Sequence, residues 1–148
     1  MKHKMLDVKF LAAGSTAEEA MSFICELTFN LINEKRGKYK IDIRCQNIDE
    51  AMKLDSQLWV EPKESFIPHN LSNNKTERDI VEIGYPGTKF SKINNKTLIN
   101  FSPSLPNQLT NYNEYLQIVI EDNSIYREEV AKTWNECRTM NLDPQFIK

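Results

Sequence analysis

The order in which two hydrophobic periodicities alternate limits the folds available to this chain. Residues Asp7–Ala12 alternate polar and apolar side chains as a strand does, and apolar residues then recur at helical spacing up to about Lys35. A second strand-like segment, Tyr39–Cys45, precedes a second helix-like segment that runs from Asn47 to about Trp59. Two successive strand–helix units with short connections favour a parallel sheet whose strands are joined by crossover helices.

Local capping signals mark where the two helices begin. Ser15 or Thr16 at the first helix and Asn47 at the second each stand three residues before a glutamate. This spacing is typical of a capping box, in which the short polar side chain accepts a hydrogen bond from the first turn. The strands are therefore expected to pass directly into helices.

The second half of the chain continues the sheet. Ile80–Tyr85 and Lys96–Ser102 are short and rich in β-branched or aromatic residues, which predicts strands. The apolar run Tyr115–Ile120 fits either a strand or the end of a helix, and a last helix is expected from Ser124 to about Met140. The sum is an α/β protein, a three-layer sandwich with a mostly parallel sheet.

Charge and composition exclude several classes of protein. The formal net charge of −2 provides no global basic field, so an extended nucleic-acid footprint is disfavoured. No run of about 18 apolar residues and no signal-peptide pattern occurs, so we expect a cytoplasmic protein without membrane contact. Cys25, Cys45 and Cys137 are odd in number and lack a CxxC pair, which favours reduced core thiols over disulfides or metal ligands.

No catalytic motif stands out. The junction AAGSTAEEA lacks the known phosphate-binding glycine patterns, and Glu18 and Glu19 in its first helical turn would repel an anion. A dyad of Cys45 or Ser65 with His69 is allowed by spacing but has no supporting motif. We therefore predict no catalytic residue, no cofactor and no metal.

The last predicted helix carries a different signal. One helical face collects Arg127, Ala131, Trp134 and Arg138, and Lys132 flanks it. Two guanidinium groups around an aromatic ring suit an acidic peptide that carries aromatic residues. In the alternative, Trp134 shares a face with Val130 and Cys137 and points into the core.

The stretch LWVEPKESFIPHNL, residues 58–71, carries the most specific pattern. The run AMKLDSQLW (51–59), a short spacer and then SFIPHNL (65–71) closely resemble the chi subunit family of bacterial DNA polymerase III, whose pattern reads roughly A-x-x-L-D-x-x-L-W and then S-F-[IV]-P-H-x-L. The resemblance extends through Tyr39–Cys45 before this stretch, and through Val81–Pro86 and Leu98–Ser102 after it.

The resemblance implies a noncatalytic accessory protein of the clamp-loader assembly, with residues 1–148 forming one domain of Rossmann-like fold that binds no dinucleotide. It implies two partners: a psi subunit and the acidic, phenylalanine-ending C-terminal tail of single-stranded DNA-binding protein. For psi or another docking partner it indicates Trp59, Phe66, Ile67, Pro68, His69 and Leu71. For the tail it indicates Arg127, Lys132, Trp134 and Arg138.

Several alternatives stay open. Phe66 and Ile67 either stand outward as a docking anchor or fold back as a lid on the sheet edge. Ala131, Thr133 and Asn135 stand where the family often carries cations, which weakens the expected tail site. The rival functions are a small-molecule or nucleotide-binding enzyme on the same scaffold, and single-strand binding through the last helix. The acidic balance disfavours direct, specific nucleic-acid binding.

Overall fold

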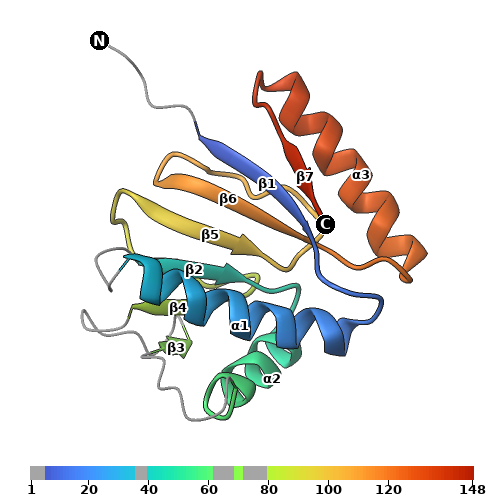
Figure 1. Ribbon diagram of the computed structural model, residues 1–148. Helices are drawn as coiled ribbons and strands as arrows, with labels where there is room; N and C mark the ends of the chain where they lie inside the picture. Colours follow the sequence, from blue (N-terminus) through green and yellow to red (C-terminus); the bar gives the residue numbers. More distant parts are fainter. Residues whose placement is uncertain (1–5, 36–39, 62–68, 72–79) are drawn as a thin grey trace.

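The computed structural model describes residues 6–35, 40–61, 69–71 and 80–148. Its elements in chain order are β1 (Asp7–Ala12), α1 (Ala17–Lys35), β2 (Ile41–Arg44), α2 (Ile48–Leu58), β3 (His69–Leu71), β4 (Val81–Gly84), β5 (Lys96–Asn100), β6 (Tyr112–Val119), α3 (Ser124–Thr139) and β7 (Gln145–Ile147). Figure 1 shows α1 and α2 on one side of the sheet and α3 on the other.

The strands form one seven-stranded sheet in the order β3-β4-β2-β5-β6-β1-β7. Every neighbouring pair runs parallel. The expected three-layer α/β sandwich is confirmed, since parallel neighbours need crossover connections that place helices on the faces of the sheet. No helix in the described part of the chain is long and apolar enough to cross a membrane.

The predicted helix starts are present as hydrogen bonds. The Thr16 Oγ1 accepts from the Glu19 amide at 3.1 Å, and the Asn47 side chain accepts from the Glu50 amide at 2.8 Å. Gly14 precedes the first helix with φ of 106°, where a Cβ would stand 2.5 Å from the Glu19 carboxylate. A glycine is therefore needed for both the backbone conformation and the close approach.

The two faces of the sheet differ in chemistry. The face toward α1 and α2 is apolar, with Ile41 and Ile43 of β2 almost fully buried, as their alternation predicts. On the opposite face of the same strand, Asp42 is also fully buried, although the alternation suggests a solvent-facing position. The reason is tertiary: residues 85–92 and 106–112 surround this face beside α3.

The structure also answers questions about strands and cysteines that the sequence left open. Of the run 115–120, residues 115–119 are strand within β6 (Tyr112–Val119), and the run is not the end of a helix. The short strands β3 and β7 were not expected from sequence, because three residues are too few to show a period. The three cysteines are reduced and buried, which confirms the prediction of core thiols.

Candidate functional site

Helix α3 is fixed to the sheet by a stripe of buried side chains at helical spacing. These are Tyr126, Val130, Thr133 and Cys137. The Tyr126 hydroxyl lies 2.7 Å from the Phe101 carbonyl oxygen and 2.8 Å from that of Ile118. The Thr133 hydroxyl donates to the Pro103 carbonyl at 2.6 Å. These polar contacts set the rotation of α3 and so decide which of its faces remains accessible.

Trp134 stands at the border between this buried stripe and the surface. Its ring meets Phe10 of β1 edge-on, with ring centroids 5.0 Å apart and planes at 78°. The side chain is only partly buried, so it packs on the core with one edge and leaves the rest accessible. Trp134 therefore packs partly against the core, and its role in binding a peptide stays a prediction.

The accessible flank of α3 has a basic bias. At about 100° per residue, Arg127 and Arg138 project within about 40° of Trp134, whereas Glu129 and Glu136 project at least about 140° away. Arg127, Arg138 and Lys132 are all exposed. Lys132 projects about 160° from Trp134 by the same spacing, so the structure does not bring it to this flank.

Strand β7 adds an aromatic residue that the sequence reading missed. Phe146 pairs in register with Phe10, so its ring lies on the sheet face that bears α3, and it is 50% exposed. We call Arg127, Trp134, Arg138 and Phe146 the α3–β7 surface. The signal in the sequence was the short run QFI after Pro144, which reads as a strand only when its partner β1 is known.

The buried Thr133 also explains one departure from the family pattern. Its side chain is 1% exposed and bonds to the Pro103 carbonyl, so a cation at this position would face the core. Ala131 and Asn135, the other two departures from the family pattern, are exposed, and neither carries a charge.

The second surface lies along α2 on the other side of the sheet. Ile48, Met52 and Trp59 are exposed and recur at i, i+4 and i+11, which aligns them on one helical face. Trp59 is 57% exposed at the C-cap, whereas the preceding Leu58 is 1% exposed. We call Ile48, Met52, Trp59 and Val60 the α2 surface.

A groove of about 850 Å³ between α1 and α2 adjoins this surface. Met21, Met52 and Val60 line it together with Glu18, Asp49 and Glu50, and among the described lining residues Lys53 is the one cation. The Gln57 side-chain amide donates to the Ser22 hydroxyl at 3.0 Å and so links the two helices. The α2 surface is therefore apolar with an acidic border.

The rest of the predicted docking loop is only partly described. Phe66, Ile67 and Pro68 lie outside the described residues, and so does Ser65. The backbone of His69 belongs to β3, but its side chain lies outside the described part. Leu71 is partly buried against the core. The choice between anchor and lid for Phe66 and Ile67 stays a prediction.

The catalytic alternatives gain no support from the geometry. Cys45 is 1% exposed, and burial raises the pKa of its thiol well above the usual range, which suppresses the reactive thiolate. At the β1–α1 junction the Ser15 amide donates to the Glu19 carboxylate at 3.0 Å, so a carboxylate already occupies that amide. Among the described residues, no cluster of His, Cys, Asp or Glu is placed to hold a metal ion.

Comparison with known proteins agrees with the pattern in residues 51–71. A family model described as DNA polymerase III chi subunit, HolC, matches residues 5–145. The chain is 29% identical over 118 residues to DNA polymerase III subunit chi of Escherichia coli (strain K12), covering 78% of this chain and 80% of that protein. It is 26% identical over 108 residues to DNA polymerase III subunit chi of Haemophilus influenzae, covering 68% of this chain and 74% of that protein.

Proposed function

Since this chain belongs to the DNA polymerase III chi subunit family, we propose that it is a noncatalytic accessory subunit that bridges two partners during DNA replication. One partner is a psi subunit of the clamp loader, and the other is the C-terminal tail of single-stranded DNA-binding protein. The observation that carries this proposal is a pair of exposed apolar surfaces, the α2 surface and the α3–β7 surface, on opposite faces of one sheet.

The charges around each surface favour a different partner. The tail is acidic and ends in phenylalanine, so it suits the α3–β7 surface, where Arg127 and Arg138 flank the aromatic ring of Trp134. The terminal phenyl ring would pack beside Trp134 and Phe146, and a guanidinium group would hold the terminal carboxylate. The α2 surface, with its acidic border, suits an apolar segment of psi that carries basic residues.

Bridging requires that both partners bind at once. The two surfaces lie on opposite sides of the sheet, so a peptide on α3 and a protein on α2 would not compete for space. The parallel sheet lies between them.

The tail arm of the proposal is tested by fluorescence polarisation with a labelled peptide of the host protein's acidic, phenylalanine-ending tail. We expect micromolar affinity that weakens with salt and falls about threefold in Arg138→Gln, because an exposed ion pair contributes about 0.2–1 kcal/mol. Glu136→Gln on the far flank is the matched control and should bind as tightly as the parent. Absence of binding, or equal loss in both variants, would reject the α3–β7 surface.

The psi arm is tested separately by calorimetric titration with the purified psi subunit of the same organism. Trp59→Ala should lose at least about tenfold in affinity, as interfacial tryptophans often do. Ile125→Ala, which removes a side chain 73% exposed on α3, is the control. Tail peptide added at saturation should leave the affinity for psi unchanged; mutual exclusion would contradict a bridge.

A further inference from the structure

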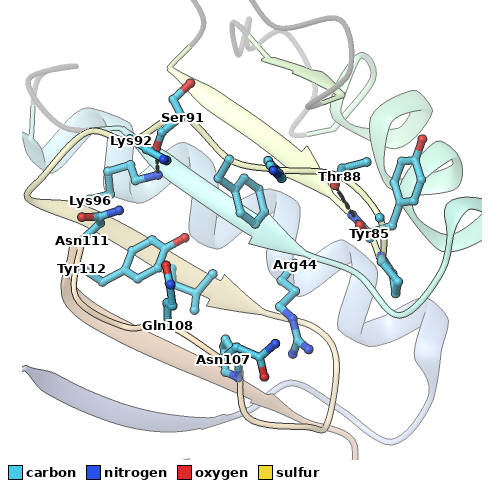
Figure 2. Close-up of a pocket in the computed structure, with 16 residues that line it drawn as sticks. Arg44, Tyr85, Thr88, Ser91, Lys92, Lys96, Asn107, Gln108, Asn111 and Tyr112 are labelled. Atoms are coloured by element: carbon cyan, nitrogen blue, oxygen red, sulfur yellow. Dashed lines mark hydrogen bonds between the residues drawn. The ribbon is translucent and has the colours of Figure 1, made fainter.

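A cavity of about 770 Å³ opens on the face of the sheet opposite α1 and α2 (Figure 2). Its floor includes Arg44 of β2 and Leu98 of β5, and its walls come from residues 85–92 and 106–112. Neither proposed docking surface contributes to it. Its volume falls within the roughly 300–1,000 Å³ typical of small-molecule sites.

The strand order places this cavity at a reversal of the chain. Strands β2 and β5 are neighbours, but the chain leaves β2 toward β3 and β4 and leaves β5 toward β6, on the opposite side. In open α/β sheets, ligands bind in the crevice at the carboxyl ends of two strands whose connections diverge in this way. Arg44, the last residue of β2, lines the cavity at this carboxyl end, and the cavity extends along the sheet face to Lys96 and Tyr112, the first residues of β5 and β6.

The residues lining the cavity are strongly biased in charge. Of those that the structure describes, four are cationic, namely Arg44, Lys89, Lys92 and Lys96, and none is acidic. The chain as a whole has a formal net charge of −2, so this concentration of cations is local. An electropositive concave surface of this kind attracts an anion.

The cations are held in different ways. Lys96 bonds to the buried Asp42 carboxylate, which offsets its charge. The Arg44 guanidinium donates to three neutral groups, the Ser104 carbonyl at 2.7 Å, the Asn100 side-chain oxygen at 3.2 Å and the Ser104 hydroxyl at 3.3 Å, so its orientation is fixed without a compensating negative charge. A fixed, charged guanidinium is well suited to a phosphate group.

The remaining lining suits a flat polar ring. Figure 2 shows Arg44 and Asn107 on one side of the cavity, Lys92, Lys96 and Asn111 on the other, and Tyr112 with Gln108 between them. Aromatic rings provide stacking surfaces, and side-chain amides offer both donors and acceptors to the edge of a base.

We propose that this cavity binds a nucleotide, with its phosphate attracted by the cations on the two sides of the cavity, Arg44 on one and Lys92 on the other, and its base held by the aromatic and amide side chains. The shared chemistry is a phosphate joined to a heteroaromatic base, whether it belongs to a free nucleotide or to a nucleotide of a single strand. This site is distinct from the β1–α1 junction, where Glu19 occupies the Ser15 amide. A small ligand would then bind to a protein whose other proposed partners are two macromolecules.

The test is a polarisation titration of the full-length protein with fluorescently labelled ADP, followed by competition with unlabelled ADP, inorganic phosphate and a short oligothymidylate. We expect saturable binding that weakens with salt and falls about tenfold in Lys92→Gln, since the cavity then loses one of the cations that attract the phosphate. Lys92 is exposed, so its replacement leaves the fold intact. Arg44→Gln should weaken binding further, with its folding checked by circular dichroism.

Lys132→Gln makes the same charge change on α3, outside the cavity, and should bind labelled ADP like the parent. Stronger competition by ADP than by oligothymidylate assigns the site to free nucleotides, and the reverse order assigns it to single-stranded DNA. The proposal is overturned if labelled ADP does not bind at millimolar concentration, or if Lys132→Gln and Lys92→Gln weaken binding equally.

Discussion

The Lys96 ammonium group lies 2.5 Å from Oδ2 of Asp42, and the two side chains are 1% and 0% exposed. The Tyr112 hydroxyl donates to the same carboxylate oxygen at 2.6 Å, and Lys96 donates further to the Ser91 carbonyl at 2.6 Å. The other oxygen, Asp42 Oδ1, has no hydrogen-bond partner within the described residues. The pair joins β2 to β5 beneath the cavity, so its integrity bears on both stability and ligand binding.

Breaking this pair should be costly. Lys96→Met leaves the Asp42 carboxylate buried without its cation, and we expect a loss of about 3–5 kcal/mol in the free energy of unfolding at pH 7. Urea denaturation measures it. Lys92→Met, at an exposed neighbouring lysine, is the control and should change stability by less than about 0.5 kcal/mol. Similar values for the two variants would show that the pair is not important for stability.

The pH dependence of stability follows from the same carboxyl group. Burial raises the pKa of Asp42 from 3.8 to about 6, although Lys96 and Tyr112 oppose the shift. Because the folded pKa is above the unfolded one, the contribution of Asp42 is fully present below pH 4 and is lost as the pH rises to about 6, by about 3 kcal/mol. Denaturation across this range, compared with Asp42→Asn, isolates the effect. Parallel pH profiles for the two proteins would contradict it.

Alanine substitutions at two adjacent residues at the end of α2 should differ greatly in their effect on stability. Trp59→Ala removes a mostly exposed side chain and should change stability by less than about 1 kcal/mol, whereas Leu58→Ala should lose about 2–5 kcal/mol. Urea unfolding followed by circular dichroism measures the stability of both variants, because the fluorescence of Trp59 is lost in one of them. A large loss in Trp59→Ala would favour a structural role over docking.

Trp134 should affect stability and tail affinity together. Trp134→Ala removes the edge contact with Phe10 and the accessible part of the α3–β7 surface, so we expect a loss of about 1–3 kcal/mol in stability and weaker tail binding. Trp134→Phe keeps an aromatic ring and should retain most of the stability and most of the tail affinity. If Trp134→Ala binds the tail as tightly as the parent, the ring serves only the core.

Tyr126 tests how α3 is oriented. Tyr126→Phe removes a buried hydroxyl placed between two carbonyl oxygens and should cost about 1–3 kcal/mol, because the carbonyls lose a donor that water cannot easily replace. Tail affinity should change little if α3 keeps its rotation. Thermal unfolding and peptide titration measure the two effects.

Local signals accounted for much of the fold. Thr16 and Asn47 marked helix starts because a cap involves only residues within one turn, and β1 and α3 were located from hydrophobic period to within a residue or two. The family pattern in residues 51–71 pointed to Trp59, and the structure places that ring in a longer exposed stripe with Ile48 and Met52.

Other features needed the tertiary structure. The alternation in β2 could not reveal that Asp42 is buried, because its partner Lys96 is 54 residues away and meets it only when β5 lies beside β2. Likewise, Phe146 joins Trp134 at one surface only because β7 pairs with β1. The sequence by itself determined the order of helices and strands, the helix caps and the family, since these depend on neighbours along the chain. Only the tertiary structure decided which polar groups are buried together and where the surfaces and the cavity form, because strand order brings distant residues into contact.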